Sequence, residues 1–142
     1  MASGDDSSTD GEVNTFIPLY QSTHEPYGLL DYFRWQNMKE AAWKFDVSPI
    51  NKWKFTPQLN LFWLENRHDS WYNSSGTVVR TKTSGNRSSY VGKEVSLRAY
   101  YDVTKYVKWE SGYAHFFPGD FVEKTGAHND VDWVYSQITF KY

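Results

Sequence analysis

The sequence predicts an all-β fold: an antiparallel transmembrane β-barrel segment of about five to six strands with long extracellular loops, part of a larger barrel. Three observations support this prediction. Apolar and polar side chains alternate with period two along several runs, which is the spacing of a strand. Aromatic residues reach 19% of the chain, while aliphatic residues are scarce. Long and short connections alternate along the sequence, as they do in transmembrane barrels.

The chain divides into two regions. Residues 1–36 combine polar residues, Pro, Gly and scattered aromatics without a clear period, and they predict an extracellular loop region. Residues 37–142 carry the alternating runs and predict C-terminal barrel strands, which form one structural unit that is incomplete alone. About five strands cannot close around themselves, and outer-membrane barrels start at about eight. We therefore expect further strands, from the same parent chain or from other chains.

The run at residues 53–63 has the dimensions of a membrane span. Trp53 and Trp63 bracket its apolar face and are ten residues apart. That separation is about 33 Å of strand at roughly 3.3 Å per residue, or about 23 Å of height at a tilt near 45°. Transmembrane barrels carry an apolar band about 25 Å tall between aromatic girdles. The run therefore predicts a strand that crosses a bilayer.

The runs at residues 40–47, 94–103, 107–114 and 133–142 repeat this alternation. We expect the apolar face of each run to contact lipid and the polar face to line a water-filled pore. The predicted lipid-facing residues are Trp43, Phe45, Trp53, Leu59, Leu61, Trp63, Val95, Leu97, Tyr101, Trp109, Ile138, Phe140 and Tyr142. The predicted pore-lining residues are Glu40, Lys44, Asp46, Lys54, Gln58, Glu94, Arg98, Asp102, Lys108 and Glu110.

Composition excludes several classes of function. The net charge is −2, with 15 basic and 17 acidic residues, so no basic field exists to hold a nucleic acid. The absence of cysteine excludes disulfides, thiolate metal sites and thiol catalysis. No run approaches the roughly 18 apolar residues of a membrane helix, and the first residues lack a signal peptide, which an exported parent would have lost.

The charges on the polar faces have two interpretations. They could attract an ionic solute through a focused potential and so form a selectivity lining. Alternatively, Glu94, Arg98, Asp102 and Lys108 could pair with neighbours across strands and hold the wall in shape. Both interpretations are compatible with one wall.

The loops offer weaker candidates. His68, His115 and His128 suggest a metal site with Asp120 or Glu123, but no spacing among them enforces ligation, and we expect neither a metal nor a cofactor.

Catalysis and sugar binding in the loops are weaker still. Glu65 and Asp69 could act as paired carboxylates, yet such pairs are recognised by separation in space, and we expect no enzyme. The loop aromatics either stack on sugar rings or pack the loops; they are Trp71, Tyr72, Phe116 and Phe117.

Several motifs carry a resemblance to a known family. They include Trp35-Gln36-Asn37, Phe62-Trp63-Leu64, the stretch from Asp69 to Gly76, Val91-Gly92-Lys93-Glu94, and the closing stretch from Asp132 to Tyr142. The stretch from Gly112 to Phe121 is the most specific. These motifs resemble the alginate export proteins of the bacterial outer membrane.

The resemblance implies the C-terminal end of a much longer outer-membrane barrel in a Gram-negative cell. Its partners would be outer-membrane lipid and lipopolysaccharide, the remaining strands, and the barrel assembly machinery, which would read the closing aromatic strand. The family lines its pore with many arginines, whereas the lining predicted here mixes both signs. We expect a porin or exporter wall that passes a polar or anionic solute, such as the polysaccharide alginate. Two alternatives stay open: a soluble all-β carbohydrate-binding module, and a barrel sheath around partner proteins.

Overall fold

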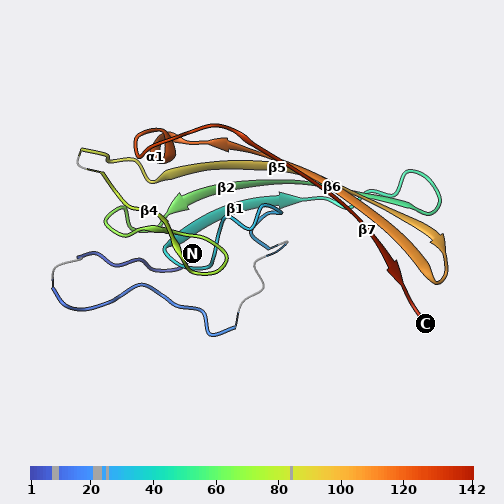
Figure 1. Cartoon of the computed structure of the whole chain (residues 1–142), viewed down its shortest axis with the longest axis horizontal. Helices are drawn as coiled ribbons and strands as arrows, with labels where there is room; N and C mark the ends of the chain where they lie inside the picture. The colour runs from blue at the N-terminus through green and yellow to red at the C-terminus, as the bar shows by residue number, and fades with distance from the viewer. Residues whose placement is uncertain (8–9, 21–23, 25, 84) are drawn as a thin grey trace.

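A five-stranded antiparallel sheet dominates the computed structural model, which describes residues 1–7, 10–20, 24, 26–83 and 85–142. The strand order is β1-β2-β5-β6-β7, so each strand pairs with the next strand of this sheet along the chain (Figure 1). The prediction of an all-β antiparallel fold is confirmed, with five strands in this sheet. Residues 8–9, 21–23 and 25 of the predicted loop region lie outside the described residues. The strands are β1 (Met38–Lys44), β2 (Trp53–Leu64), β5 (Tyr90–Thr104), β6 (Val107–Pro118) and β7 (Val131–Phe140).

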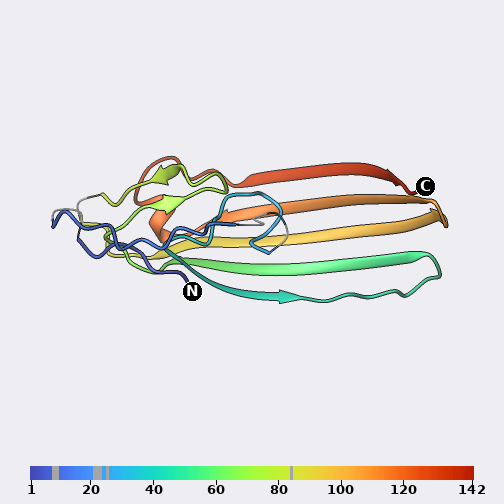
Figure 2. The same ribbon diagram turned by 90° about the horizontal axis from the view of Figure 1, so that it is seen from below.

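The long connections all lie at one end of the sheet, which we call the loop end. They are the described residues of the ranges 1–37, 65–89 and 119–130 (Figure 2). The shorter connections, residues 45–52 and 105–106, lie at the opposite end, which we call the turn end. This segregation is the one that alternating loop lengths predict, because every second connection of an antiparallel meander falls at the same end.

Three small elements fold within the long connections. β3 (Trp71–Tyr72) and β4 (Val78–Arg80) pair antiparallel. In the turn between them, Asn73 Oδ1 accepts hydrogen bonds from the backbone N–H groups two and four residues further along, at 3.1 and 2.9 Å. α1 (Asp120–Glu123) follows β6. The sequence predicted only loops here, because strands of two or three residues are too short for a period to show.

Successive side chains of each strand point to opposite faces of the sheet. Leu59 of β2, for example, lies opposite Val95 of β5, and its neighbour Asn60 lies opposite Glu94. The sheet is arched, and the described residues of the N-terminal region, 1–7, 10–20, 24 and 26–36, lie under it on the face that we call concave (Figure 1). The opposite, convex face carries the apolar alternation. Side chains of like polarity therefore gather on one face because the register aligns the alternation of all five strands.

The pairing of β5 with β2 is interrupted by a bulge near the loop end. Phe62 pairs with Gly92 and Trp63 with Tyr90, so Val91 has no partner on β2. Gly92 has a φ of 151°, and a Cβ at this position would overlap the neighbouring strand β6. Glycine supplies this conformation without a steric penalty. The bulge accompanies the complete burial of Val91 in the hydrophobic core.

Pro57 lies inside β2 although proline cannot donate to a ladder. Its carbonyl accepts a hydrogen bond from the Phe45 N–H at 3.1 Å, so its missing donor faces the edge strand rather than β5. β1 ends at Lys44, and the pairing resumes at a single bridge between Val47 and Phe55. A proline is tolerated on this side because only an edge strand loses a bond.

The hydrophobic core lies on the concave side at the loop end. Phe33 stacks on Phe62 with ring centroids 3.6 Å apart, and Trp71 and Phe116 pack around this pair. The other buried members are Met38, Leu64, Val91, Phe121 and Val122. All three long connections thus contribute a side chain to one cluster. The core fixes them against the sheet and leaves the turn end uncovered (Figure 2).

β1 and β7 are the outer strands of the sheet. In the part of the chain that the structure describes, β1 pairs with β2 and, at Met38, through one bridge with Ala2, and β7 pairs with β6. The two edges therefore present backbone groups that can accept further strands. No helix among the described residues is long and apolar enough to cross a membrane.

Candidate functional site

The concave face brings the predicted pore-lining residues together. Thr56 pairs with Arg98, which in turn pairs with Gly112, so one row of side chains crosses the sheet from β2 to β6. Asp46 lies beyond β1 and joins this face by accepting a hydrogen bond from the Thr56 hydroxyl at 2.6 Å. All ten predicted pore-lining residues lie on this face: Glu40, Lys44, Asp46, Lys54, Gln58, Glu94, Arg98, Asp102, Lys108 and Glu110.

The loop-end half of this face is covered by the chain itself. Asn60 and Glu94 are fully buried there, and Gln58 is nearly so. Their side chains bond one another: Gln58 Nε2 donates to Asn60 Oδ1 at 2.9 Å, and Asn60 Nδ2 donates to Glu40 Oε1 at 2.5 Å. Buried polar groups must be paired in this way, because an unpaired one costs about 1–3 kcal/mol. This part of the face is a packed polar layer.

Glu94, on strand β5 of the sheet, holds the covering residues in place. Its carboxylate accepts hydrogen bonds from the backbone N–H groups of Leu29, at 2.7 Å, and of Leu30, at 3.4 Å. Such charge-assisted bonds are about twice as strong as neutral ones. A predicted pore-lining carboxylate is thus occupied by the chain's own backbone.

Asp69, in the second long connection, binds two residues near the start of the chain. It is buried and accepts hydrogen bonds from the Thr15 hydroxyl at 2.6 Å and from the Asp5 N–H at 2.9 Å. The Tyr72 hydroxyl also donates to it, at 2.7 Å. Burial and this bond to a carboxylate together raise the pKa of Tyr72 to about 12.

This Tyr72 pKa predicts that the loop packing weakens in alkali. Above pH 10 an unfolded chain loses the phenolic proton while the folded chain retains it, so stability is present below the ordinary tyrosine pKa and falls as the pH rises towards 12. The difference in phenolate absorption between the wild type and Tyr72→Phe should therefore titrate near pH 12. A difference that titrates near pH 10 would contradict this account of the Asp69 contact.

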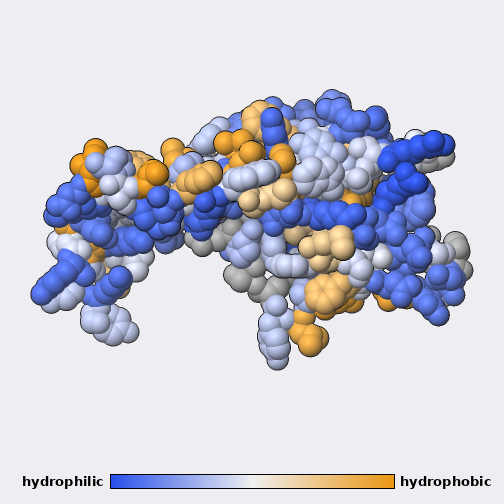
Figure 3. Space-filling view, turned by 180° about the vertical axis from the view of Figure 1, so that it is seen from behind, coloured by the Kyte–Doolittle hydropathy of each residue, from blue (hydrophilic) through white to orange (hydrophobic). Residues whose placement is uncertain are grey.

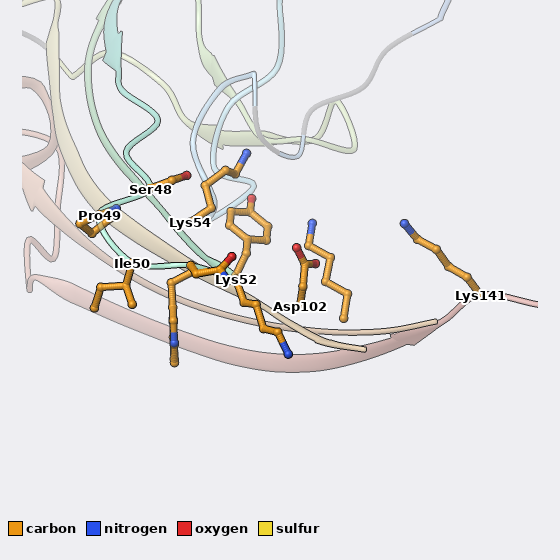
Figure 4. A pocket seen from close by; sticks show the side chains of 11 residues that line it. Ser48, Pro49, Ile50, Lys52, Lys54, Asp102 and Lys141 are labelled. Carbon is orange, nitrogen blue, oxygen red and sulfur yellow. The ribbon is translucent and has the colours of Figure 1, made fainter. Parts of the chain in front are cut away.

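The turn-end half of the concave face is open and forms a cavity of about 600 Å³. Figure 3 shows the space under the arch at this end. Four lysines and one aspartate are among its lining residues: Lys52, Lys54, Lys108, Lys141 and Asp102. Lys54, Lys141 and Asp102 point to the same side of the sheet, whereas Lys52 extends away from them (Figure 4). The cavity is consequently rich in ammonium groups.

Tyr100 organises these lysines. The Lys108 ammonium lies 4.2 Å and the Lys54 ammonium 4.8 Å from the centre of its ring. Cations over an aromatic face are attracted by its quadrupole. Lys54 also forms a salt bridge with Asp46, at 3.4 Å. The cluster can therefore attract the carboxylates of a solute while retaining it only weakly, since ammonium groups are strongly hydrated point charges.

The convex face carries the predicted lipid-facing residues. Trp53 packs against Tyr101 and Trp109 at the turn end, with centroids 4.8 and 6.0 Å apart, and Trp63 packs against Tyr90 at the loop end at 5.7 Å. Aliphatic side chains lie between these two aromatic groups: Leu59, Leu61, Val95 and Leu97. Trp43, Ile138 and Phe140 are exposed on the flanking strands, Phe45 is exposed just beyond the end of β1, and Tyr142 lies beyond the end of β7.

Two serines interrupt the apolar convex face and are satisfied locally. Ser111 lies opposite Ser136. The Ser111 hydroxyl donates to the Tyr135 carbonyl at 2.7 Å, and the Trp109 indole donates to the Ser136 hydroxyl at 2.8 Å. Their polar groups are therefore paired within the sheet, which reduces the cost of placing them on an apolar surface.

The histidines of the predicted metal site do not converge with Asp120 and Glu123 in the described part of the chain. His115 Nδ1 lies 2.7 Å from Asp132 rather than beside Asp120 or Glu123. Glu65 lies 3.6 Å from Lys39, whereas Asp69 bonds the residues named above. Within the described ranges no group of three or more His, Cys, Asp or Glu side chains could hold a metal ion.

The loop aromatics chiefly pack the loops. Trp71 and Phe116 are buried in the core, and the Trp71 indole donates to the Tyr32 carbonyl at 2.9 Å. Phe117 lies on the convex side, where the Lys93 ammonium is 4.7 Å from its ring centre. What sequence reasoning missed is that residues 26–36 lie on the polar face. The apolar residues Leu29, Leu30 and Phe33 in a loop-like stretch were the available signal.

The comparisons with known proteins agree with the motifs. No curated protein and no solved structure matches the chain significantly. A family model described as alginate export matches residues 1–135, which include the loop region, β1 to β6 and half of β7. Since this match covers nearly all of the 142 residues, the chain belongs to the alginate export family.

Proposed function

We propose that the chain forms part of the wall of an outer-membrane channel through which an anionic polysaccharide passes passively and without chemical change. The observation that carries this proposal is the difference in polarity between the two faces of the sheet. An apolar convex face lies opposite a polar concave face whose open half is rich in lysine. The family is one of alginate export, and alginate, a polymer of carboxylate-bearing sugars, is the candidate solute.

The convex face has the features that a bilayer requires. Its aliphatic centre lies between aromatic groups at the two ends, as in the girdled apolar band of transmembrane barrels. Outer-membrane lipid would contact this face. Further strands would pair with the open edges of β1 and β7, because an unpaired edge cannot persist in hydrocarbon.

The concave face supplies the passage. Lysines around the turn-end cavity would raise the local concentration of an anionic solute by focusing the potential. Conduction also requires that the solute leave the channel again. The hydrated ammonium groups of Lys54 and Lys108, which share the Tyr100 ring, bind a solute carboxylate weakly enough to allow this. The turn end corresponds to the periplasmic side, since transmembrane barrels keep their short turns there.

A soluble carbohydrate-binding module would need a second layer over its apolar face. Among the residues that the structure describes, none of the named elements covers the convex side, where Val95 and Leu97 remain 45% and 46% exposed. This exposure supports the membrane wall.

Neutralising the lysine cluster tests the proposal. The triple variant K54Q/K108Q/K141Q, in the barrel purified from outer membranes, should lose anion preference, because it removes three positive charges from the passage. The reversal potential in a salt gradient should show a drop of about tenfold in the anion-to-cation permeability ratio.

The matched control is K82Q/K93Q/K124Q, which makes the same change in net charge away from the concave face. Lys82 and Lys124 lie in the loops and Lys93 on the convex side. This control should keep the permeability ratio of the wild type. Equal effects of the two triple variants would contradict a role for the turn-end lysines, and a purified barrel without conductance would contradict the channel itself.

A further inference from the structure

We propose that residues 26–36 form a fixed constriction whose anchor, Glu94, determines the largest solute that the channel admits. The proposal rests on the channel function argued above. It assigns a size-determining role to a part of the chain that the sequence predicted to be an extracellular loop.

The segment occupies the side of the sheet that would face the solute. It lies under the loop-end half of the concave face, where the sheet would otherwise be open (Figure 2). Leu29 and Phe33 are only 1% and 2% exposed, so the segment is packed as tightly as a protein core. Space taken by the segment is unavailable to a solute. The passage is therefore narrower at the loop end than at the turn end.

Glu94 anchors the segment to the wall. It is fully buried, and its two carboxylate oxygens accept the Leu29 and Leu30 N–H groups. Burying a carboxylate is unfavourable unless it is hydrogen-bonded, so the burial of Glu94 and the position of the segment depend on each other. The side chain that holds the segment lies on the same polar face as the lysines of the turn-end cavity, but at the loop end.

Gly28 allows the close approach. Its φ is 88°, and a Cβ there would overlap both carboxylate oxygens of Glu94. Any other residue would have to displace either the segment or the carboxylate. The contact thus has no room for a side chain, as expected where backbone packs directly on a wall.

An aromatic pair stiffens the segment. Tyr27 and Trp35 meet edge to face, with centroids 5.6 Å apart, and close residues 27–35 into a compact loop. The Trp35 indole donates to the Met1 carbonyl at 3.1 Å. A loop that is closed on itself and fastened at Glu94 has the properties of a rigid constriction.

Two independent variants test this inference. Glu94→Ala removes the anchor, and Gly28→Ala introduces a side chain into the contact. Each should raise the single-channel conductance of the purified barrel by about twofold or more and admit larger neutral sugars in a vesicle-swelling assay, because the passage widens. Hydrogen exchange at the Leu29 amide should also accelerate, which reports release of the anchor directly.

Both variants have matched controls. Gly11→Ala replaces another glycine with a positive φ, of 81°, but nothing lies within 4 Å of the added Cβ. Glu123→Ala also removes one carboxylate, but from α1, where the side chain is exposed and outside the predicted pore lining. Both controls should conduct like the wild type and admit the same sugars.

The outcomes separate this inference from the proposed function. A wild-type barrel that does not conduct overturns the channel and the constriction with it. A conducting wild type, with faster exchange at Leu29 but unchanged conductance and sugar size in the variants, overturns the constriction alone. If Glu94→Ala does not assemble, Gly28→Ala against Gly11→Ala decides the question by the same readouts.

Discussion

Phe62→Ala is expected to destabilise the loop-end core by about 3–5 kcal/mol, the usual cost of deleting a buried phenyl ring. Phe62 is fully buried on the concave side, and its ring stacks on Phe33 at 3.6 Å. The cavity left by the ring lies where all three long connections meet, so those connections should loosen together. A lower urea midpoint and faster proteolysis within residues 1–36 would show this.

Phe55→Ala is the matched control for Phe62→Ala. It deletes the same atoms from the same strand, but from the convex face, where Phe55 stacks on Trp53 at 5.6 Å. Because Phe55 is only partly buried, its loss should cost much less and leave the loop proteolysis unchanged. Equal losses in the two variants would show that the concave core does not hold the loops.

Leu97→Arg is expected to block stable insertion of the sheet in a membrane. Leu97 lies in the aliphatic centre of the convex face, opposite Pro57 on one side and Tyr113 on the other. An arginine near the middle of the bilayer costs about 2–4 kcal/mol on the lipid side of a barrel. The folded fraction in outer membranes, measured by heat-dependent mobility in gels, should fall sharply.

Gln137→Arg places the same charge on the concave side. Gln137 Nε2 lies 3.5 Å from Glu110, which would receive the new guanidinium. This variant should fold in the membrane like the wild type. If the two arginine variants inserted equally well, the convex face would not be the lipid-facing side, and the proposed wall would be wrong.

The strands could be predicted because their information is local. Alternation along residues 53–63 is complete within one strand, and the observed β2, Trp53–Leu64, has nearly the same bounds. β5 begins four residues earlier than its predicted run and β6 ends four residues later, since pairing at the loop end extends strands beyond their alternating parts. The turns likewise follow from short polar stretches.

The face on which each side chain lies could also be predicted, but whether that side chain is buried or open to solvent could not. Side chains of a strand alternate with an exact period of two. Once one residue is assigned correctly, such as Lys54 to the concave face, the faces of the other residues in its strand are fixed as well. Whether a polar position meets water is a different matter. Glu94 and Lys54 share a face, yet one is fully buried under the chain and the other lines an open cavity.

The sequence by itself thus determined the all-β class, the two-sided strands, the family and the separation of long from short connections. The tertiary structure alone decided which half of the polar face is open. That outcome depends on contacts between residues 65 and 54 positions apart, Leu29 with Glu94 and Thr15 with Asp69. Such contacts leave no period in the sequence, because they require only one donor and one acceptor brought together by the fold.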